Sequence, residues 1–90
     1  MEQAKVELRS VHGLRRKLVA DFCMAAAKCR FPITIGKRNG QRVDATSILD
    51  VLALDVDQGT EVVLYAHGSR AKSALQDLVN LLGRDVGAFD

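Results

Sequence analysis

The chain has 90 residues, enough for one domain with a modest core, and its 48% hydrophobic and 27% charged content argues against intrinsic disorder. Thirteen basic and 11 acidic residues give a net charge of +2, which is too small to indicate nucleic-acid binding by itself. Two cysteines exclude a disulfide scaffold, and no apolar run approaches the ~20 residues of a membrane-spanning helix. Residues 1–7 contain no apolar signal-peptide region, so we expect a cytoplasmic protein without membrane attachment.

The predicted elements begin with a strand, because apolar and charged residues alternate over residues 4–10. Apolar residues then recur at helical spacing and predict a helix at about residues 16–28. Alternation returns over 31–35, where a second strand is expected. The dipeptide Asn39-Gly40, a strong hairpin signal, connects it to a third strand over 41–45.

A short apolar helix is expected over residues 48–54. Thr46-Ser47 followed by Asp50 resembles a capping box, in which the side chain of Ser47 would accept a backbone N–H at the start of that helix. A helix of two turns cannot bury every side, so part of its apolar surface should be exposed.

The last strand and the last helix follow a turn over residues 57–60. Residues 61–66 are apolar on both faces, which predicts a strand at the centre of the sheet. Residues 71–82 then carry one apolar stripe, and Gly83 stands where a C-terminal helix cap belongs.

The complete order is therefore β-α-β-β-α-β-α. We expect an α+β fold in which a four-stranded, mainly antiparallel sheet carries three helices on one face. One domain spans residues 1–90, and residues 85–90 are expected to be a flexible tail.

Three adjacent cations, Arg15, Arg16 and Lys17, stand at the start of the first predicted helix. Helix N-termini favour negative charge, so this placement either binds an anion or an acidic partner or consists of solvated residues in an unfavourable position. His12 precedes them and is interpreted either as a phosphoacceptor or acid–base group or as a loop histidine with a structural hydrogen bond.

Ser47 and the helix after it form a second candidate site. Besides capping the helix, Ser47 is a possible phosphorylation site, although Asp50 would partly oppose the added charge. The side chains of Ile48, Leu49 and Leu52 are expected either to form a partner surface or to be buried.

The sequence contains no pattern typical of an enzyme or a metal site. Cys23 and Cys29 lie six residues apart on one predicted helix, too far apart to pair, and are expected to be small core residues. No ligand cluster, phosphate loop or catalytic triad is found, so no cofactor or metal is expected. Only Tyr65 and Phe31 could stack nucleic-acid bases, which disfavours an RNA-binding module.

The chain resembles HPr, the histidine-containing phosphocarrier of the bacterial sugar phosphotransferase system. The resemblance covers about residues 3–83. It rests on Gly13-Leu14 in the active-site loop, Ala27-Lys28 in the first helix and Asn39-Gly40 in the hairpin. It also rests on residues 47–54 in the regulatory-serine helix and residues 59–62 at the entry to the last strand. It implies the open-faced β-sandwich of that family.

The chain departs from this family at the phosphoacceptor position. HPr carries a histidine directly after Gly-Leu, and Arg15 stands there in this chain. Lys17 replaces the family's arginine and Leu18 its proline. Because a guanidinium remains protonated at neutral pH, Arg15 cannot relay a phosphoryl group.

The regulatory serine of the family is present as Ser47. The HPr-like regulator Crh keeps this serine and lacks the catalytic histidine, and the chain is similar to it in both respects. Asp50 and Asp55 stand where the family commonly has glycine, and a carboxylate near the serine disfavours a dianionic product.

We therefore expect a non-catalytic, HPr-like regulatory adaptor of the phosphotransferase system, controlled by phosphorylation of Ser47. The resemblance implies three protein partners: the HPr kinase/phosphorylase, a catabolite-control transcription factor, or Enzyme I. The alternative is a phosphocarrier that transfers the phosphoryl group through His12. The expected oligomeric state is a monomer or a strand-swapped dimer.

Overall fold

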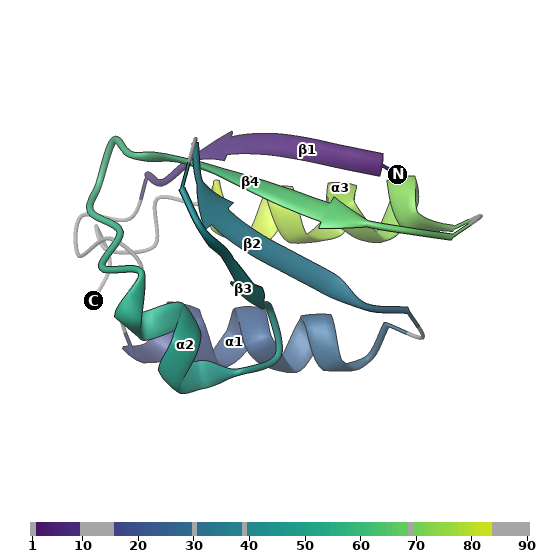
Figure 1. The fold of residues 1–90 in the computed structure, drawn as a ribbon, viewed down its shortest axis with the longest axis horizontal. Helices are drawn as coiled ribbons and strands as arrows, with labels where there is room; N and C mark the ends of the chain where they lie inside the picture. The colour runs from purple at the N-terminus through teal and green to yellow at the C-terminus, as the bar shows by residue number, and fades with distance from the viewer. Residues whose placement is uncertain (1, 10–15, 30, 39, 69, 84–90) are drawn as a thin grey trace.

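The computed structural model describes residues 2–9, 16–29, 31–38, 40–68 and 70–83. In chain order the elements are β1 (Glu2–Glu7), α1 (Arg16–Ala27), β2 (Ile33–Lys37), β3 (Arg42–Asp44), α2 (Ile48–Ala53), β4 (Glu61–Ala66) and α3 (Ala71–Leu82). This order confirms the predicted one. Figure 1 shows one sheet with the three helices gathered on one of its faces. The tail expected over 85–90 lies outside the described residues.

The four strands form one sheet in the order β1-β4-β2-β3, and every neighbouring pair is antiparallel. The strand β4 lies inside the sheet, as its two apolar faces predict. Val62 and Leu64 point into the core, whereas Val63 faces the open side and is still only 3% exposed. Its register partners there are Lys5 on β1 and Gly36 on β2.

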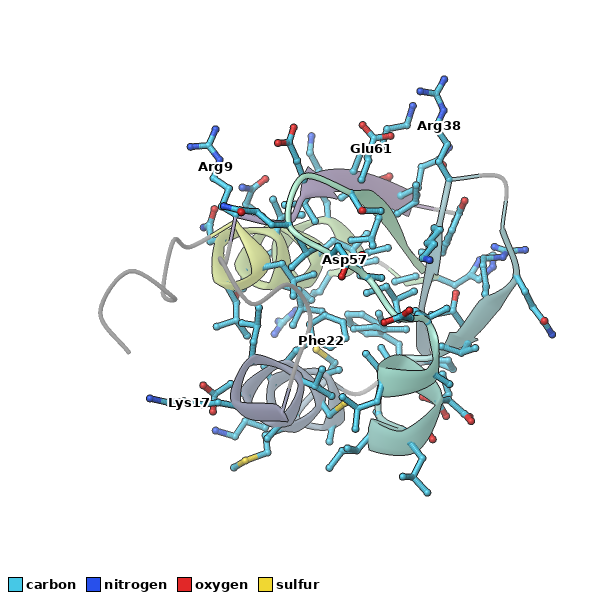
Figure 2. All side chains as sticks on the ribbon, turned by 90° about the vertical axis from the view of Figure 1, so that its left-hand side faces the viewer. Arg9, Lys17, Phe22, Arg38, Asp57 and Glu61 are labelled. Carbon is cyan, nitrogen blue, oxygen red and sulfur yellow. The ribbon has the colours of Figure 1, made fainter. Side chains whose placement is uncertain are left out.

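The core lies between the sheet and the helices, where alternate strand residues meet the apolar stripes of α1 and α3. Its largest fully buried side chains include Phe22, Leu8, Ile35, Leu64 and Leu75. Figure 2 shows Phe22 at the centre of the space that the sheet and helices enclose. Burying each such side chain contributes about 1.5–3 kcal/mol, so this layer supplies most of the driving force for folding.

The first strand begins and ends earlier than its alternation predicted. Residues 2 and 3 already pair with Ala66 and Tyr65, so β1 starts at Glu2. It ends at Glu7, after which the amide of Leu8 donates to the carbonyl of Thr60 at 3.1 Å. The alternation beyond Leu8 belongs to the segment that leaves the sheet. Periodicity alone does not distinguish this segment from the paired strand.

The connection between β2 and β3 is longer than the Asn-Gly signal suggests. The strand β2 ends at Lys37 and β3 begins at Arg42, so residues 38–41 form the connection. Lys37 continues β2 because it pairs with Val62 on the other side. The amide of Gly40 donates to the carbonyl of Lys37 at 2.8 Å, which closes the turn.

The C-terminal end of α3 is placed as predicted, but its backbone differs from that of a typical glycine cap. Gly83 is the C-cap of α3, yet its φ of −80° is right-handed and does not use the freedom of glycine. The left-handed conformation occurs instead after α2, at Asp55, whose φ is 52°. A non-glycine residue at such a φ stores strain.

Candidate functional site

The cationic candidate site is described only in part. His12 and Arg15 lie outside the described residues, and Arg16 begins α1 with a side chain that also lies outside them. Lys17 is exposed on the first turn of α1. Figure 2 shows its side chain extending from α1 on the side away from α2. The structure therefore does not bring Lys17 together with the apolar residues of α2.

The hydroxyl of Ser47 does not cap α2, contrary to the sequence prediction. Ser47 occupies the N-cap position with φ −94° and ψ 103°, but its side chain makes no capping hydrogen bond. Only its backbone takes part: the amide donates to the carbonyl of Asp44 at 3.1 Å, and its carbonyl accepts from Val51 at 3.0 Å. The side chain of Ser47 is therefore not committed to holding the helix.

Thr46 and Asp44 shape the turn before α2 instead. The backbone amide and the hydroxyl of Thr46 both donate to Oδ1 of Asp44, at 2.9 and 2.8 Å. These bonds lower the pKa of Asp44, with the backbone bond as the larger cause. Sequence reasoning missed this pair, although an Asp two residues before a Thr is typical of an Asx turn. An ionised carboxylate thus stands three residues before Ser47.

The helix α2 presents part of its apolar surface to solvent. Ile48 is 47% exposed and Leu49 is 79% exposed, whereas Val51 is fully buried. Leu52 is half-buried and packs against the core, so it contributes less to the surface than the sequence suggested. The exposed pair Ile48 and Leu49, called here the α2 surface, follows Ser47 directly. The prediction that two turns cannot be buried on every side is confirmed.

The two aromatic residues considered for base stacking are both occupied. Tyr65 faces the open side of the sheet, but the guanidinium carbon of Arg42 lies 4.3 Å from its ring centroid. Phe31 packs against the hydrophobic core. Both contacts disfavour stacking of a nucleic-acid base on these rings.

Cys23 and Cys29 are free thiols. Cys23 is buried in the core as expected, but Cys29 is only half-buried and lies beyond the end of α1. Burial is the first cause that raises both thiol pKa values, and the second is Asp44 for Cys23 and Asp77 for Cys29. Raised pKa values keep both thiols protonated at neutral pH, which disfavours nucleophilic or redox chemistry.

Neither a metal-ligand cluster nor a membrane-spanning helix is found in the part of the chain that the structure describes. No group of three or more His, Cys, Asp or Glu side chains there could hold a metal ion. None of the helices described is long and apolar enough to cross a bilayer.

Comparison with known families identifies the fold. A family model described as "PTS HPr component phosphorylation site" matches residues 2–84. The chain belongs to the HPr family. The match spans every described element, from β1 to the end of α3. The resemblance seen in the sequence is thereby confirmed.

Two curated members of the HPr family cover almost the whole chain. The phosphocarrier protein HPr of Streptomyces coelicolor is 34% identical over 96% of this chain and 92% of its own length. The HPr-like protein Crh of Bacillus subtilis is 35% identical over 96% of this chain and 100% of its own. The chain is thus similar to both a phosphocarrier and a Crh-type member, at nearly equal identity.

Solved structures of the HPr family share the fold described above. The phosphocarrier HPr of Bacillus anthracis superposes with a TM-score of 0.83 at 28% identity, covering 90% of this chain and 95% of its own. The Bacillus subtilis Crh crystal structure gives a TM-score of 0.72 at 34% identity, covering 96% and 98%. That Crh crystal is described as a domain-swapped dimer. The comparisons confirm the α+β open-faced sandwich.

Proposed function

We propose that this HPr-family chain is a regulatory adaptor that binds protein partners and does not carry a phosphoryl group on histidine. The observation that carries the proposal is the α2 surface. Ile48 and Leu49 are exposed directly after Ser47, whose hydroxyl makes no capping bond. Exposed apolar side chains next to an available hydroxyl suit partner docking that a modification can control.

Arg15 supports the absence of phosphotransfer. It directly follows Gly13-Leu14, where the family's phosphoacceptor histidine would stand. A guanidinium has no lone pair available for phosphorylation at neutral pH, because its pKa exceeds ~12. With Arg16 and Lys17, it supplies three cations for an acidic partner or an anion.

Phosphorylation of Ser47 would act as the switch. The γ-phosphoryl group of ATP passes to Oγ of Ser47, the hydroxyl proton leaves, and ADP is released. The product adds about −1.5 to −2 charges beside Ile48 and Leu49. The kinase would be an HPr kinase/phosphorylase, and the partner a catabolite-control transcription factor. Such a partner must supply cations, because Asp44 and Asp50 already make the start of α2 acidic.

The oligomeric state belongs to the same proposal. In the described sheet β1 is an edge strand that pairs with β4, which makes it available for exchange between two copies. A monomer and a strand-swapped dimer are therefore both compatible with the adaptor function. One HPr-like unit over residues 1–90 suffices for it.

Phosphoryl transfer from Enzyme I tests the first half of the proposal. The purified chain is incubated with Enzyme I and labelled phosphoenolpyruvate, with an authentic HPr as the positive control. We expect no acid-labile label on this chain. An Arg15→His variant tests whether a histidine at the family's phosphoacceptor position is sufficient to restore labelling. Stoichiometric labelling of the unmodified chain that disappears in His12→Ala would overturn the adaptor function and establish the phosphocarrier alternative.

Incubation with an HPr kinase and ATP tests the second half. We expect acid-stable phosphorylation that Ser47→Ala abolishes and that Ser73→Ala, an exposed serine on α3, leaves unchanged. Asp50→Asn should increase the extent of phosphorylation, because it removes a carboxylate that opposes the new charge. Equal phosphorylation of the Ser47→Ala variant would refute Ser47 as the switch.

A further inference from the structure

A groove separates α1 from α3 on the surface that the helices present to solvent. Its volume is about 570 Å³. It is lined by Asp21, Met24, Ala25, Lys28, Cys29, Ala74, Asp77, Leu78 and Leu81. Neither α2 nor Ser47 contributes to it, so the groove is distinct from the α2 surface.

The floor of the groove is apolar, and one large apolar side chain on its edge is exposed. Small side chains on both helices, Ala25 and Ala74, leave room between the helices above the buried Leu78. Met24 is 62% exposed, although it belongs to a helix whose other large apolar residues are buried. Unbranched methionine side chains adapt to varied partner shapes. The lining therefore suits an aliphatic side chain from another molecule.

Carboxylates dominate the charge around the groove. Asp21 on α1 and Asp77 on α3 line it from opposite helices, with Lys28 as the one cation among the lining residues. Asp77 acts on Cys29, which also lines the groove, because its charge is one cause of the raised pKa of that thiol. In a chain with a net charge of +2, this groove thus carries a local excess of negative charge.

We propose that the groove between α1 and α3 binds a cationic amphipathic helix of a partner protein. The segment of α1 from Asp21 to Lys28 is about 10 Å long at 1.5 Å per residue, which matches two turns of a helix. Aliphatic side chains spaced by three or four residues would enter between Ala25 and Leu78, as in other helix-in-groove complexes. Lysine or arginine side chains on its flanks would face Asp21 and Asp77.

A second copy of this chain does not fit the groove through its α2 surface. Ile48 and Leu49 are the other large apolar side chains exposed among the described residues. Asp50 follows them directly, so docking α2 into the groove would set its carboxylate against Asp21 and Asp77. Like charges brought together at an interface oppose binding. A partner with cations beside its apolar residues has no such conflict.

Titration with two designed peptides tests the proposal. Each has about 14 residues, roughly four helical turns, with leucines on one face. One carries lysines beside the leucines and the other carries glutamates. Binding to the full-length ¹⁵N-labelled chain is followed by NMR. We expect the lysine peptide to shift the amides of Ala25, Ala74 and Leu81, saturably and at least about threefold more tightly than the glutamate peptide.

Variants distinguish binding in the groove from non-specific electrostatic attraction between the peptide and the protein. Asp21→Asn with Asp77→Asn should weaken the lysine peptide about two- to tenfold and remove the difference between the peptides. Asp57→Asn, an exposed carboxylate outside the groove lining, is the matched control and should not change binding. A bound lysine peptide should also slow alkylation of Cys29, which lines the groove.

Three results would overturn the proposal. They are equal affinity for both peptides, unchanged binding in the double variant, or shifts confined to α2. Ser47→Ala and Leu49→Ala leave the groove intact, so their effects on kinase or partner binding report on the proposed function alone. Failure of one inference is thereby distinguishable from failure of the other.

Discussion

Asp55 has the backbone conformation that favours glycine, and replacing it should stabilise the protein. Its φ is 52°, and its amide donates to the carbonyl of Leu52 at 3.1 Å as α2 ends. Left-handed backbone costs an L-residue about 1–2 kcal/mol, and glycine avoids this cost. Glycine also adds about 0.4–1 kcal/mol of unfolded-state entropy. The two terms leave about 0–1.6 kcal/mol, and glycine also gives up a further interaction that Asp55 makes, so Asp55→Gly is expected to raise the free energy of unfolding by up to about 1 kcal/mol.

Urea and thermal unfolding followed by circular dichroism measure this change. A gain of up to about 1 kcal/mol corresponds to a rise of up to roughly 8 °C in Tm for a domain of this size. Asp50→Gly is the matched control, since Asp50 lies inside α2 and glycine there should cost about 0.5–1 kcal/mol. Asp55→Asn removes the charge and keeps a residue that tolerates the left-handed backbone. If Asp55→Gly destabilises as much as Asp50→Gly, the strain argument is refuted.

Three further predictions concern the turn before α2 and the sheet. Ser47→Ala should change the unfolding free energy by less than ~0.5 kcal/mol, because no capping bond is lost; a loss above ~1 kcal/mol in urea unfolding would contradict this. Gly36→Ala should lower it by about 1–3 kcal/mol, because a Cβ would lie 2.7 Å from the carbonyl oxygen of Gln41; an unchanged urea midpoint would contradict this. The lowered pKa of Asp44 stabilises the fold above the unfolded pKa of about 3.9, and that stability is lost as the pH falls through the folded pKa. Thr46→Val should reduce the loss of stability as the pH falls below the unfolded pKa of about 3.9, and an identical loss would refute the role of the Thr46 hydroxyl.

Most of the fold could be predicted because side-chain periodicity reports directly on burial. Residues 62–66 are apolar on both faces of the strand, and residues 61–66 form the interior strand β4 over the predicted bounds. The stripe over 71–82 likewise became α3, with Leu75 and Leu78 buried. These predictions depend on patterns within one segment, and the physics that decides them is local.

The features that sequence reasoning missed depend on contacts between segments or on competing local bonds. Ser47 has the residue type and position of a cap, but the turn made by Thr46 and Asp44 sets the chain direction without its hydroxyl. The exposure of Met24, by contrast, agrees with helical periodicity, because Met24 lies two residues and about 200° around α1 from the buried Phe22.

The distribution of charge around the exposed apolar residues bears on the kind of partner. Leu49 is followed by Asp50 on α2, and Met24 lies one turn from Asp21 on α1. Each exposed apolar position on these helices thus has a carboxylate beside it, although the chain as a whole is cationic. Lys17 extends to the other side of α1 from α2. A partner that contacts the α2 surface alone therefore needs cations, and one that also reaches Lys17 needs acidic groups at a second, separate position.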